Sequence, residues 1–304
     1  MTKALVVGFG SIGSRHARVL TELDCSVSVV SSRSIIDFKN YRSLEDALLH
    51  FAPDYVVIAN ETSAHLGTLQ HLADSGYEGM ILVEKPLAVH PVNLPEHRFR
   101  QVAMAYNLRF HPLLNALREA LAGEEVIAVQ VYCGQYLPDW RPGTDYRNSY
   151  SAKKELGGGV LRDLSHEVDY MRWLFGDWRR LAALGGQLGE LEIDSDDCWG
   201  LLIEYERCPV ATLHINYLDR SGRREIVVNT KKHTIKADLK SSMLEYDGKV
   251  RSLNYQRDDT YRAQHIAMLA GDTSLLCKLE EGVQVMKFLS ACETAASTGQ
   301  WVSR

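Results

Sequence analysis

The chain has 304 residues, with 34 Lys and Arg against 39 Asp and Glu and a formal net charge of −5. At roughly 150 residues per domain this length predicts two domains, and the charge balance argues against a protein built to bind nucleic acid or an anionic membrane. No apolar run approaches the roughly 18 residues of a membrane-spanning helix, and the first apolar run is too short for a signal peptide, so we expect a cytoplasmic protein.

Short apolar runs alternate with amphipathic segments over the first hundred-odd residues. This alternation is typical of strand–helix–strand units around a parallel sheet. The predicted strands are 3–7, 27–30, 55–59 and 80–83. The predicted helices are 11–23, a helix that begins after the N-cap Ser43, and 64–74.

Beyond about residue 120 the pattern changes to strands in succession. Several of them alternate apolar and polar residues, as in an antiparallel sheet with one solvated face. The predicted strands are 126–132, 199–205, 209–217, 224–230 and 234–238. One helix is predicted after Gly157-Gly158-Gly159 and another over 279–297. We therefore predict an α/β domain over residues 1–120 and an α+β domain with a large open, mostly antiparallel sheet over residues 121–304. The alternative for the C-terminal helix is that it packs back on the first domain.

The six cysteines carry neither a disulfide framework nor a metal signal. They are scattered, with no C-x-x-C pair and no Cys/His cluster at zinc spacing. We expect all six to be reduced and buried, and we expect no metal centre.

The first chemical motif is a glycine-rich turn, Gly8-Phe9-Gly10-Ser11-Ile12-Gly13, between a predicted strand and a predicted helix. In a dinucleotide-binding turn the first glycine permits the bend, the second lets the backbone approach a pyrophosphate, and the third allows close packing. The phosphate charge rests on free N–H groups at the helix start. A glycine turn of this kind can be purely structural, but its place after the N-terminal strand of a repeated β/α pattern predicts a Rossmann domain.

The position that would bind the adenosine ribose lacks a carboxylate. Sites for NAD place Asp or Glu about 20 residues after the glycines, where it accepts a hydrogen bond from the 2′-hydroxyl. Here the chain reads Ser31-Ser32-Arg33, two hydroxyls and a guanidinium that could bind a 2′-phosphate. We therefore expect NADP in preference to NAD. The alternatives are that Arg33 is only a solvated loop residue and that Asp37 serves the ribose.

Polar residues follow two of the predicted strands at the edge where such sheets bind ligands. After residue 59 comes Asn60-Glu61-Thr62-Ser63-Ala64-His65, and after residue 83 comes Glu84-Lys85-Pro86. A lysine beside a proline has a restricted backbone and could be aimed at the nicotinamide, although a surface lysine is the alternative. The residues that we expect to line the cofactor here are Asn60, Glu61, His65, Glu84 and Lys85.

Four motifs together resemble a known family. They are the glycine turn followed by His16, Glu84-Lys85-Pro86, Asn107-Leu108-Arg109-Phe110-His111-Pro112, and Gly157-Gly158-Gly159-x-x-x-Asp163-x-x-His166-x-x-Asp169. Their order and spacing are similar to those of the Gfo/Idh/MocA family, which includes glucose-fructose oxidoreductase, inositol dehydrogenase and the rhizopine-catabolism protein MocA. The resemblance covers essentially the whole chain.

The resemblance implies a Rossmann domain joined to a second domain whose open sheet often packs against another subunit. It implies catalysis in a crevice between the domains, where hydride passes between the nicotinamide and a carbon that bears a sugar hydroxyl. By resemblance, Lys85, Asp163 and His166 form the catalytic group, and the Lys85–Pro86 bond is cis as in relatives.

Residue chemistry suggests a role for each member of this group. If residues 161–175 form one helix, Asp163 and His166 are neighbours at i and i+3. They then lie beside a buried apolar stripe that consists of Leu164, Val168, Met171 and Phe175. We expect His166 to act as the acid/base, Lys85 to donate a hydrogen bond to the substrate oxygen, and Asp163 to orient His166. The commoner family pattern has three residues between Asp and His, so Arg162 could occupy the usual carboxylate position. A buried structural histidine is the alternative for His166.

The substrate contacts that we expect come from a loop over 137–147 and from Arg109. Aromatic faces stack on sugar rings, and Arg binds carboxylate or phosphate through two hydrogen bonds, so these residues favour a sugar acid or sugar nucleotide. The alternative is that the loop packs over the cofactor. The expected contacts are Arg109, Trp140, Arg141, Tyr146, Arg147, Asp163 and His166. We interpret the basic residues Arg220, Arg223, Arg224, Lys231 and Lys232 as a solvated strand edge.

Three classes of function follow. The first is an NAD(P)-dependent dehydrogenase or reductase acting on a CH–OH group of a sugar, and the second is a glycosidase of the same family that uses NAD transiently. The third is a non-catalytic dinucleotide-binding regulator, which Lys85 and His166 disfavour because binding alone needs neither. A broad sheet with a bare face also predicts a homodimer or homotetramer assembled through the second domain.

Overall fold

Two compact units share the chain, and the computed structural model describes all residues from 1 to 304. The first unit contains residues 1–110 and 256–286, and the second contains residues 111–255 and 287–304. The predicted division at residue 120 placed the later residues in the second domain, except that the C-terminal helix could pack back on the first. The structure instead returns one later segment to the first unit.

This return has a physical cause within the first unit. A short strand, β15 (Cys277–Lys278), pairs antiparallel with β6 (Gln101–Met104), and α7 (Asp259–Ala270) packs on α1 (Ser11–Glu22). Neither β6 nor α7 was predicted from the sequence. The later segment thus extends the sheet of the first unit and covers part of it.

The sheet of the first unit has the strand order of the Rossmann fold. Its seven strands run β15-β6-β5-β4-β1-β2-β3, and every neighbouring pair except β15 with β6 is parallel. Without β15 this is the order 3-2-1-4-5-6. The strands not yet given are β1 (Lys3–Val7), β2 (Ser26–Val30), β3 (Lys39–Tyr41), β4 (Tyr55–Ile58) and β5 (Met80–Val83). The four strands predicted for this part are confirmed.

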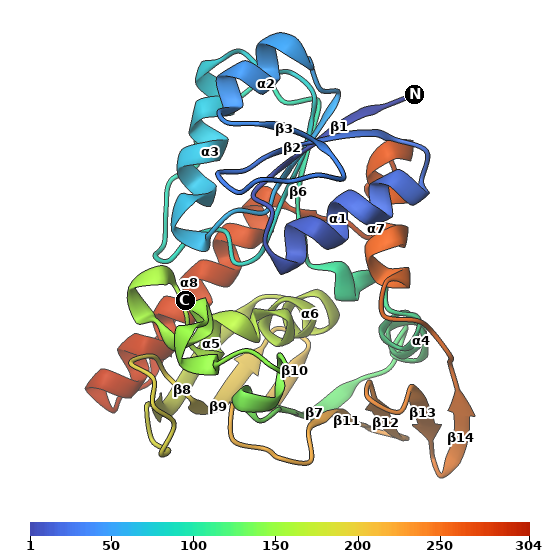
Figure 1. Ribbon diagram of the computed structural model, residues 1–304. Helices are drawn as coiled ribbons and strands as arrows, with labels where there is room; N and C mark the ends of the chain where they lie inside the picture. The colour runs from blue at the N-terminus through green and yellow to red at the C-terminus, as the bar shows by residue number, and fades with distance from the viewer. The chain divides into compact units, whose positions relative to one another are not determined.

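Helices cover both faces of this sheet. Figure 1 shows α2 (Leu44–His50) and α3 (Thr62–Asp74) on one side of the strands, with α1 and α7 on the other. The N-cap prediction is confirmed, because the Ser43 side chain accepts a hydrogen bond from the Asp46 N–H. With both faces covered, the central strands β1, β4 and β5 consist almost wholly of buried apolar residues.

The second unit is built on a nine-stranded sheet in the order β14-β13-β12-β11-β7-β10-β9-β8-β16. Only β10 and β7 pair parallel, so the prediction of a large, mostly antiparallel sheet is confirmed. The strands are β7 (Val126–Gly134), β8 (Trp178–Gly186), β9 (Cys198–Tyr205), β10 (Cys208–Asn216), β11 (Arg223–Thr230), β12 (Thr234–Asp238), β13 (Met243–Tyr246), β14 (Lys249–Ser252) and β16 (Val302–Ser303).

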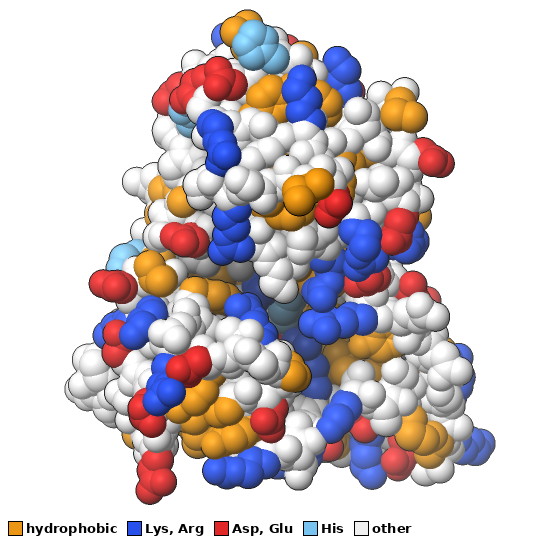
Figure 2. Space-filling model, in the orientation of Figure 1, with side chains coloured by type: hydrophobic (Ala, Val, Ile, Leu, Met, Phe, Trp, Pro, Cys, Tyr) orange, Lys and Arg blue, Asp and Glu red, His pale blue; other side chains and the backbone are white.

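The interpretation of the basic stretch as a strand edge is wrong. Strand β11 is hydrogen-bonded to β7 on one side and to β12 on the other, so it lies inside the sheet. Arg223 is bound to Asp219, and Arg224 reaches the fully buried Glu167 with an Nε to Oε1 distance of 2.7 Å. On the visible face of the second unit, basic side chains are interspersed with acidic ones (Figure 2).

The helix predicted after the glycine run is broken in two. The first part is α5 (Val160–Asp163), and α6 (Ser165–Phe175) follows after Leu164, whose φ of −96° and ψ of 28° depart from helical geometry. The other helices are α4 (Pro112–Ala120) and α8 (Leu279–Thr298), which the division between the units crosses. None of the helices is both long and apolar enough to cross a bilayer.

All six cysteines are free thiols. Five of them are buried as predicted, but Cys198 is only partly buried, because its strand position faces the outer side of the sheet. Burial raises the pKa of the Cys133 and Cys292 thiols, which keeps them protonated and unreactive.

Candidate functional site

The glycine turn gives each glycine the surroundings that dinucleotide binding requires. Gly8 has a φ of +95°, and a Cβ there would meet the Asn60 backbone nitrogen at 2.5 Å. A Cβ on Gly13 would lie 2.0 Å from the Gly8 oxygen, so α1 packs directly on the turn. Gly10, in contrast, has no atom within 4 Å of its Cβ position. The turn is therefore closed on the protein side and open where a pyrophosphate would approach.

Polar atoms around the turn also fit a bound dinucleotide. Gly10 is the N-cap of α1 and offers no side chain to the first-turn N–H groups, which have no acceptor within their own helix. The Asn60 amide donates to the Thr68 hydroxyl at 2.8 Å, while its Oδ1 is buried without a hydrogen-bond partner. A buried acceptor of this kind is costly unless a ligand or water satisfies it. Phe9 is partly buried and packs edge-on against Phe38.

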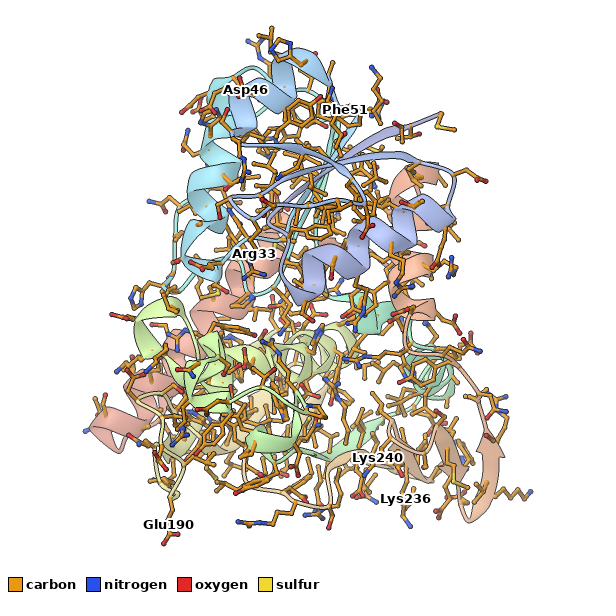
Figure 3. The ribbon with its side chains drawn as sticks, in the orientation of Figure 1. Arg33, Asp46, Phe51, Glu190, Lys236 and Lys240 are labelled. Atoms are coloured by element: carbon orange, nitrogen blue, oxygen red, sulfur yellow. The ribbon has the colours of Figure 1, made fainter.

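The loop after β2 is held in place by residues in and directly after β3, a strand that was not predicted from the sequence. The Asn40 side chain accepts a hydrogen bond from the Ser31 N–H on its Oδ1 and donates one from its Nδ2 to the Arg33 carbonyl. The Arg42 guanidinium donates to the carbonyls of Ser31, Ser32 and Arg33. The Arg33 side chain is exposed on the loop (Figure 3). Two guanidinium groups therefore border the turn at which a ribose 2′-substituent would sit. A three-residue strand is too short for periodicity to show, so the sequence offered no signal for Asn40 within it or for Arg42, which follows it.

The polar residues after β5 anchor Lys85 on both sides. Glu84 accepts the Lys85 backbone N–H on Oε2 at 3.0 Å, and its Oε1 lies 2.8 Å from His16 Nε2. His65 Nδ1 lies 2.9 Å from the Pro86 carbonyl oxygen. The Lys85–Pro86 bond is cis, as the resemblance implied.

Burial separates the residues of this region into two kinds. Glu84 and His65 are buried, and burial lowers the pKa of His65, so its imidazole is neutral. Burial alone would raise the pKa of Glu84, but the hydrogen bond from His16 and the charge of Lys85 outweigh it and lower that pKa. Both side chains are thus committed to neighbours inside the protein. Glu61 is exposed at the N-cap of α3, and Lys85 is partly exposed.

In the second unit, the glycine run lets Asp196 cap the start of α5. Gly159 has a φ of +113°, and a Cβ on it would meet Asp196 Oδ1 at 2.1 Å. The Asp196 carboxylate accepts the Leu161 N–H at 2.8 Å and the Trp199 indole N–H at 2.8 Å. This cap fixes the short helix that carries Asp163 at its last position.

Asp163 is held by two tyrosines that the sequence analysis did not identify. The Tyr150 hydroxyl donates to Oδ1 at 2.5 Å and the Tyr217 hydroxyl donates to Oδ2 at 2.6 Å. Burial, reinforced by the Asp163 charge, raises the pKa of both phenols well above the ordinary value, so both remain donors. Trp140 packs edge-on against Tyr217, and the Arg141 guanidinium lies 5.9 Å from the centre of the Tyr150 ring. Asp163 therefore lies within an aromatic cluster.

Two residues near Asp163 in the sequence, Arg162 and His166, differ in their burial. Arg162, in the usual carboxylate position of the resembled family, is buried and forms an ion pair with Glu293 of α8 at 2.8 Å. His166 is partly exposed on the first turn of α6. The apolar stripe predicted beside it is confirmed, since Leu164, Val168, Met171 and Phe175 are all buried.

The remaining expected substrate contacts are divided between different places. Tyr146 accepts the Glu192 N–H through its hydroxyl, and Arg147 is exposed and paired with Asp145 and Glu192. Arg109 is only 2% exposed, and its guanidinium forks onto Glu281 at 3.0 and 3.1 Å in the first unit. An arginine committed in this way is a structural residue and is not available to bind a substrate.

One cavity in the first unit lies away from the glycine turn. It measures about 430 Å³ and is lined by residues that precede β4 and β5, among them Asp54, Tyr77 and Gly79. The amino ends of parallel strands lie at the edge opposite their carboxyl ends, where ligands bind in such sheets. Figure 3 shows Phe51, which follows α2, and Arg33 at opposite ends of the first unit.

Fold and site together define a dinucleotide-binding protein of the Rossmann class. Residues 2–98 match the family model described as "Oxidoreductase family, NAD-binding Rossmann fold", and residues 114–236 match that of the GFO/IDH/MocA C-terminal domain. The two matched ranges span more than two thirds of the chain. The chain belongs to the Gfo/Idh/MocA oxidoreductase family, as the resemblance of its motifs indicated.

Individual relatives are distant. An uncharacterized oxidoreductase of Synechocystis sp. is 28% identical over 151 residues, which are 47% of this chain and 40% of the relative. Among solved structures, the WlbA dehydrogenase from Bordetella pertussis in complex with NADH and UDP-GlcNAcA has a TM-score of 0.82 at 18% identity, over 100% of this chain and 99% of that one. GenD2 from gentamicin A biosynthesis, in complex with NAD, has a TM-score of 0.80 at 22% identity, over 100% and 96%. These structures establish the fold.

Proposed function

We propose that this chain is an NAD(P)-dependent oxidoreductase that transfers a hydride between the nicotinamide and a hydroxyl or keto carbon of a sugar, sugar acid or sugar nucleotide. The observation that carries the proposal is the glycine turn, which is open only at Gly10 beside uncapped helix N–H groups and the orphaned Asn60 Oδ1. Structures of the same fold include a levoglucosan dehydrogenase in complex with NADH, besides the sugar-nucleotide complex of WlbA.

Three residues carry the proposed chemistry. When bound, the nicotinamide supplies the acceptor or donor of the hydride. Lys85, anchored through its backbone by Glu84, donates a hydrogen bond to the reacting oxygen of the substrate. His166 exchanges a proton with that oxygen. Asp163, fixed by Tyr150 and Tyr217, orients His166.

We propose NADP as the preferred cofactor. The loop after β2 carries no carboxylate at positions 31–33, and Arg33 and Arg42 are two cations beside it. A guanidinium can bind a phosphate through two parallel hydrogen bonds, whereas a ribose 2′-hydroxyl needs an acceptor. Thermal unfolding with NAD, NADP and their reduced forms tests this preference. Stabilisation by NAD alone would refute it.

The substrate that we propose is an anionic sugar. Trp140 and Arg141 lie within the aromatic cluster around Asp163, and an apolar ring face beside a cation suits a pyranose that carries a carboxylate or phosphate. The test is a screen of sugar nucleotides and sugar acids that follows nicotinamide absorbance. Net accumulation of reduced cofactor also separates a dehydrogenase from a glycosidase that uses its cofactor transiently.

We also propose that a second copy of the chain covers the outer face of the large sheet. Three apolar residues on this face are exposed: Leu184 by 77%, Leu202 by 42% and Val210 by 49%. They come from adjacent strands, since β9 pairs with both β8 and β10. Exposed apolar patches of this kind mark association sites, and a symmetric dimer or tetramer buries them. Light scattering that shows only a 34.2 kDa species would refute assembly.

A further inference from the structure

A continuous chain of hydrogen bonds runs through the core of the first unit from Tyr55 to Glu84. The Tyr55 hydroxyl lies 2.9 Å from His265 Nδ1, and His265 Nε2 lies 2.8 Å from His16 Nδ1. His16 Nε2 in turn lies 2.8 Å from Glu84 Oε1. Tyr55, His16 and His265 are completely buried, and Glu84 is 6% exposed.

The four residues come from four different elements. Tyr55 is the first residue of β4, His16 lies on α1, His265 lies on α7, and Glu84 follows the last residue of β5. The chain therefore connects the amino edge of the sheet with its carboxyl edge, where Lys85 follows Glu84. Its last link is the hydrogen bond from the Lys85 N–H to Glu84 Oε2.

The protonation states of Tyr55, His265 and Glu84 restrict the directions that the chain can take. Burial raises the pKa of Tyr55 well above its ordinary value, so its hydroxyl keeps its proton. Burial lowers the pKa of His265 well below its usual range, so His265 is neutral and has a single N–H. Because Glu84 is a carboxylate, it must accept. With a neutral His16, Tyr55 donates to His265 Nδ1, His265 Nε2–H donates to His16 Nδ1, and His16 Nε2–H donates to Glu84. A doubly protonated His16 would instead donate to both Glu84 and His265.

Stability alone does not account for this arrangement. Apolar residues of similar volume in a core are often as stabilising as a buried polar network, and sometimes more so. A fully satisfied network does, however, fix its members in one geometry. The group fixed at its end is the carboxylate that holds the Lys85 peptide, while His65 holds the Pro86 carbonyl on the other side.

We propose that Tyr55, His265, His16 and Glu84 form one directed hydrogen-bond chain that positions Lys85 for the reaction. The first three are positioning residues that act through Glu84. This inference rests on the proposed function for its catalytic consequence, whereas the direction of the chain and the anchoring of Lys85 are measurable without any substrate.

The direction of the chain is tested by nitrogen-15 NMR of the histidine rings in the full-length protein. We expect His16 and His265 to carry their protons on Nε2. In Glu84→Gln the side-chain amide can accept the Lys85 N–H only by turning its NH₂ group toward His16. Both histidines should then change to the Nδ1–H form, which reverses every donor in the chain. Tyr77→Phe, which removes a tyrosine hydroxyl bonded to Met80 O outside the chain, should leave both rings unchanged.

Two results would overturn the directed chain. One is a doubly protonated His16 in the wild-type protein at neutral pH, which would make the Glu84 contact a simple ion pair. The other is unchanged ring protonation in Glu84→Gln. If Glu84→Gln does not fold, the wild-type spectrum alone still decides between the directed chain and the ion pair.

The anchoring of Lys85 is tested by hydrogen exchange and by turnover. We expect Lys85 N–H exchange to accelerate at least tenfold in Glu84→Ala and to stay near the wild-type rate in Glu84→Gln. In turnover with NADP and a sugar found by the screen, Glu84→Ala should lower kcat by about 100-fold while the KM for NADP changes little, and Glu84→Gln should restore most of kcat. Unchanged exchange in Glu84→Ala would overturn the positioning role. Absence of turnover in the wild-type protein would count against the proposed function, and exchange would still decide this inference.

Discussion

The glycine turn allows ligand binding and folding to be perturbed separately. Gly10 has an extended backbone, with φ −84° and ψ −164°, and open space around its Cβ position. Gly10→Ala therefore needs no strained conformation and should change the free energy of unfolding of the free protein by less than about 1 kcal/mol. A methyl group at this position would nevertheless stand where a pyrophosphate must approach.

The size of the expected effect on binding follows from packing. Inserting a methyl group into an occupied contact costs about 1–3 kcal/mol, which corresponds to an affinity about 5- to 150-fold weaker. At 100 times the wild-type dissociation constant, NADP stabilises the wild-type protein by about 2.7 kcal/mol, and a site weakened 100-fold would retain only about 0.4 kcal/mol. Gly10→Ala should therefore unfold like the wild-type protein without cofactor and lose most of the stabilisation by NADP.

Two other glycines serve as comparisons in the same denaturation assay. In Gly13→Ala the new Cβ would lie 2.0 Å from the Gly8 oxygen, so the free protein itself should lose about 1–3 kcal/mol or more. Gly67→Ala lies inside α3 with no atom within 4 Å, and it should gain up to about 1 kcal/mol and retain the full NADP effect. Full NADP stabilisation of Gly10→Ala would refute the assignment of this turn to the pyrophosphate.

Four further predictions concern the cofactor, the catalytic residues, the subunit contact and pH. Arg33→Glu should reverse the preference from NADP to NAD in thermal unfolding, because its carboxylate repels a 2′-phosphate and can accept from a ribose hydroxyl. Lys85→Ala and His166→Ala should each lower kcat by about 100-fold or more, and a loss of only a few-fold in both would refute their roles. Leu202→Arg should shift light scattering toward the 34.2 kDa monomer. Burial lowers the pKa of His111 to about 4, whereas in the unfolded chain it lies near 6.5. As the pH falls, the unfolded chain therefore binds this proton before the folded protein does, and the free energy of unfolding should fall between about pH 6.5 and pH 4. In urea denaturation His111→Asn, which keeps an N-cap side chain on α4, should lose less stability over this range.

Periodicity and turn chemistry were sufficient for the parts of the fold that are locally determined. The four strands predicted in the first unit and the Ser43 cap are found where apolar runs and a short polar residue placed them. Strand β3 has three residues, and every residue of β14 is exposed, so neither carries an apolar pattern that could reveal it. The return of α7 to the first unit depends on contacts with residues more than 200 positions earlier, such as His265 with His16, which no local pattern encodes.

The same limit applies to the site. Arg109 has the residue type of an anion ligand, but its partner Glu281 lies 172 positions away and takes up its guanidinium. Tyr150 and Tyr217 come from a loop and a strand end and meet only at Asp163. Sequence reasoning therefore identified which residue types could do the chemistry. Long-range partners decide which of these side chains are already committed to the protein.

The shortened spacing between Asp163 and His166 illustrates how the two levels combine. On one continuous helix, residues three apart would lie about 60° from each other around the axis, and residues four apart about 40°. The chain avoids this constraint by ending α5 at Asp163 and starting α6 at Ser165, with Leu164 outside helical geometry. The orientation of Asp163 is then set by its two tyrosine donors and by the Asp196 cap on α5 rather than by helical register. The break thus frees the position of the carboxylate from the residue count of a continuous helix.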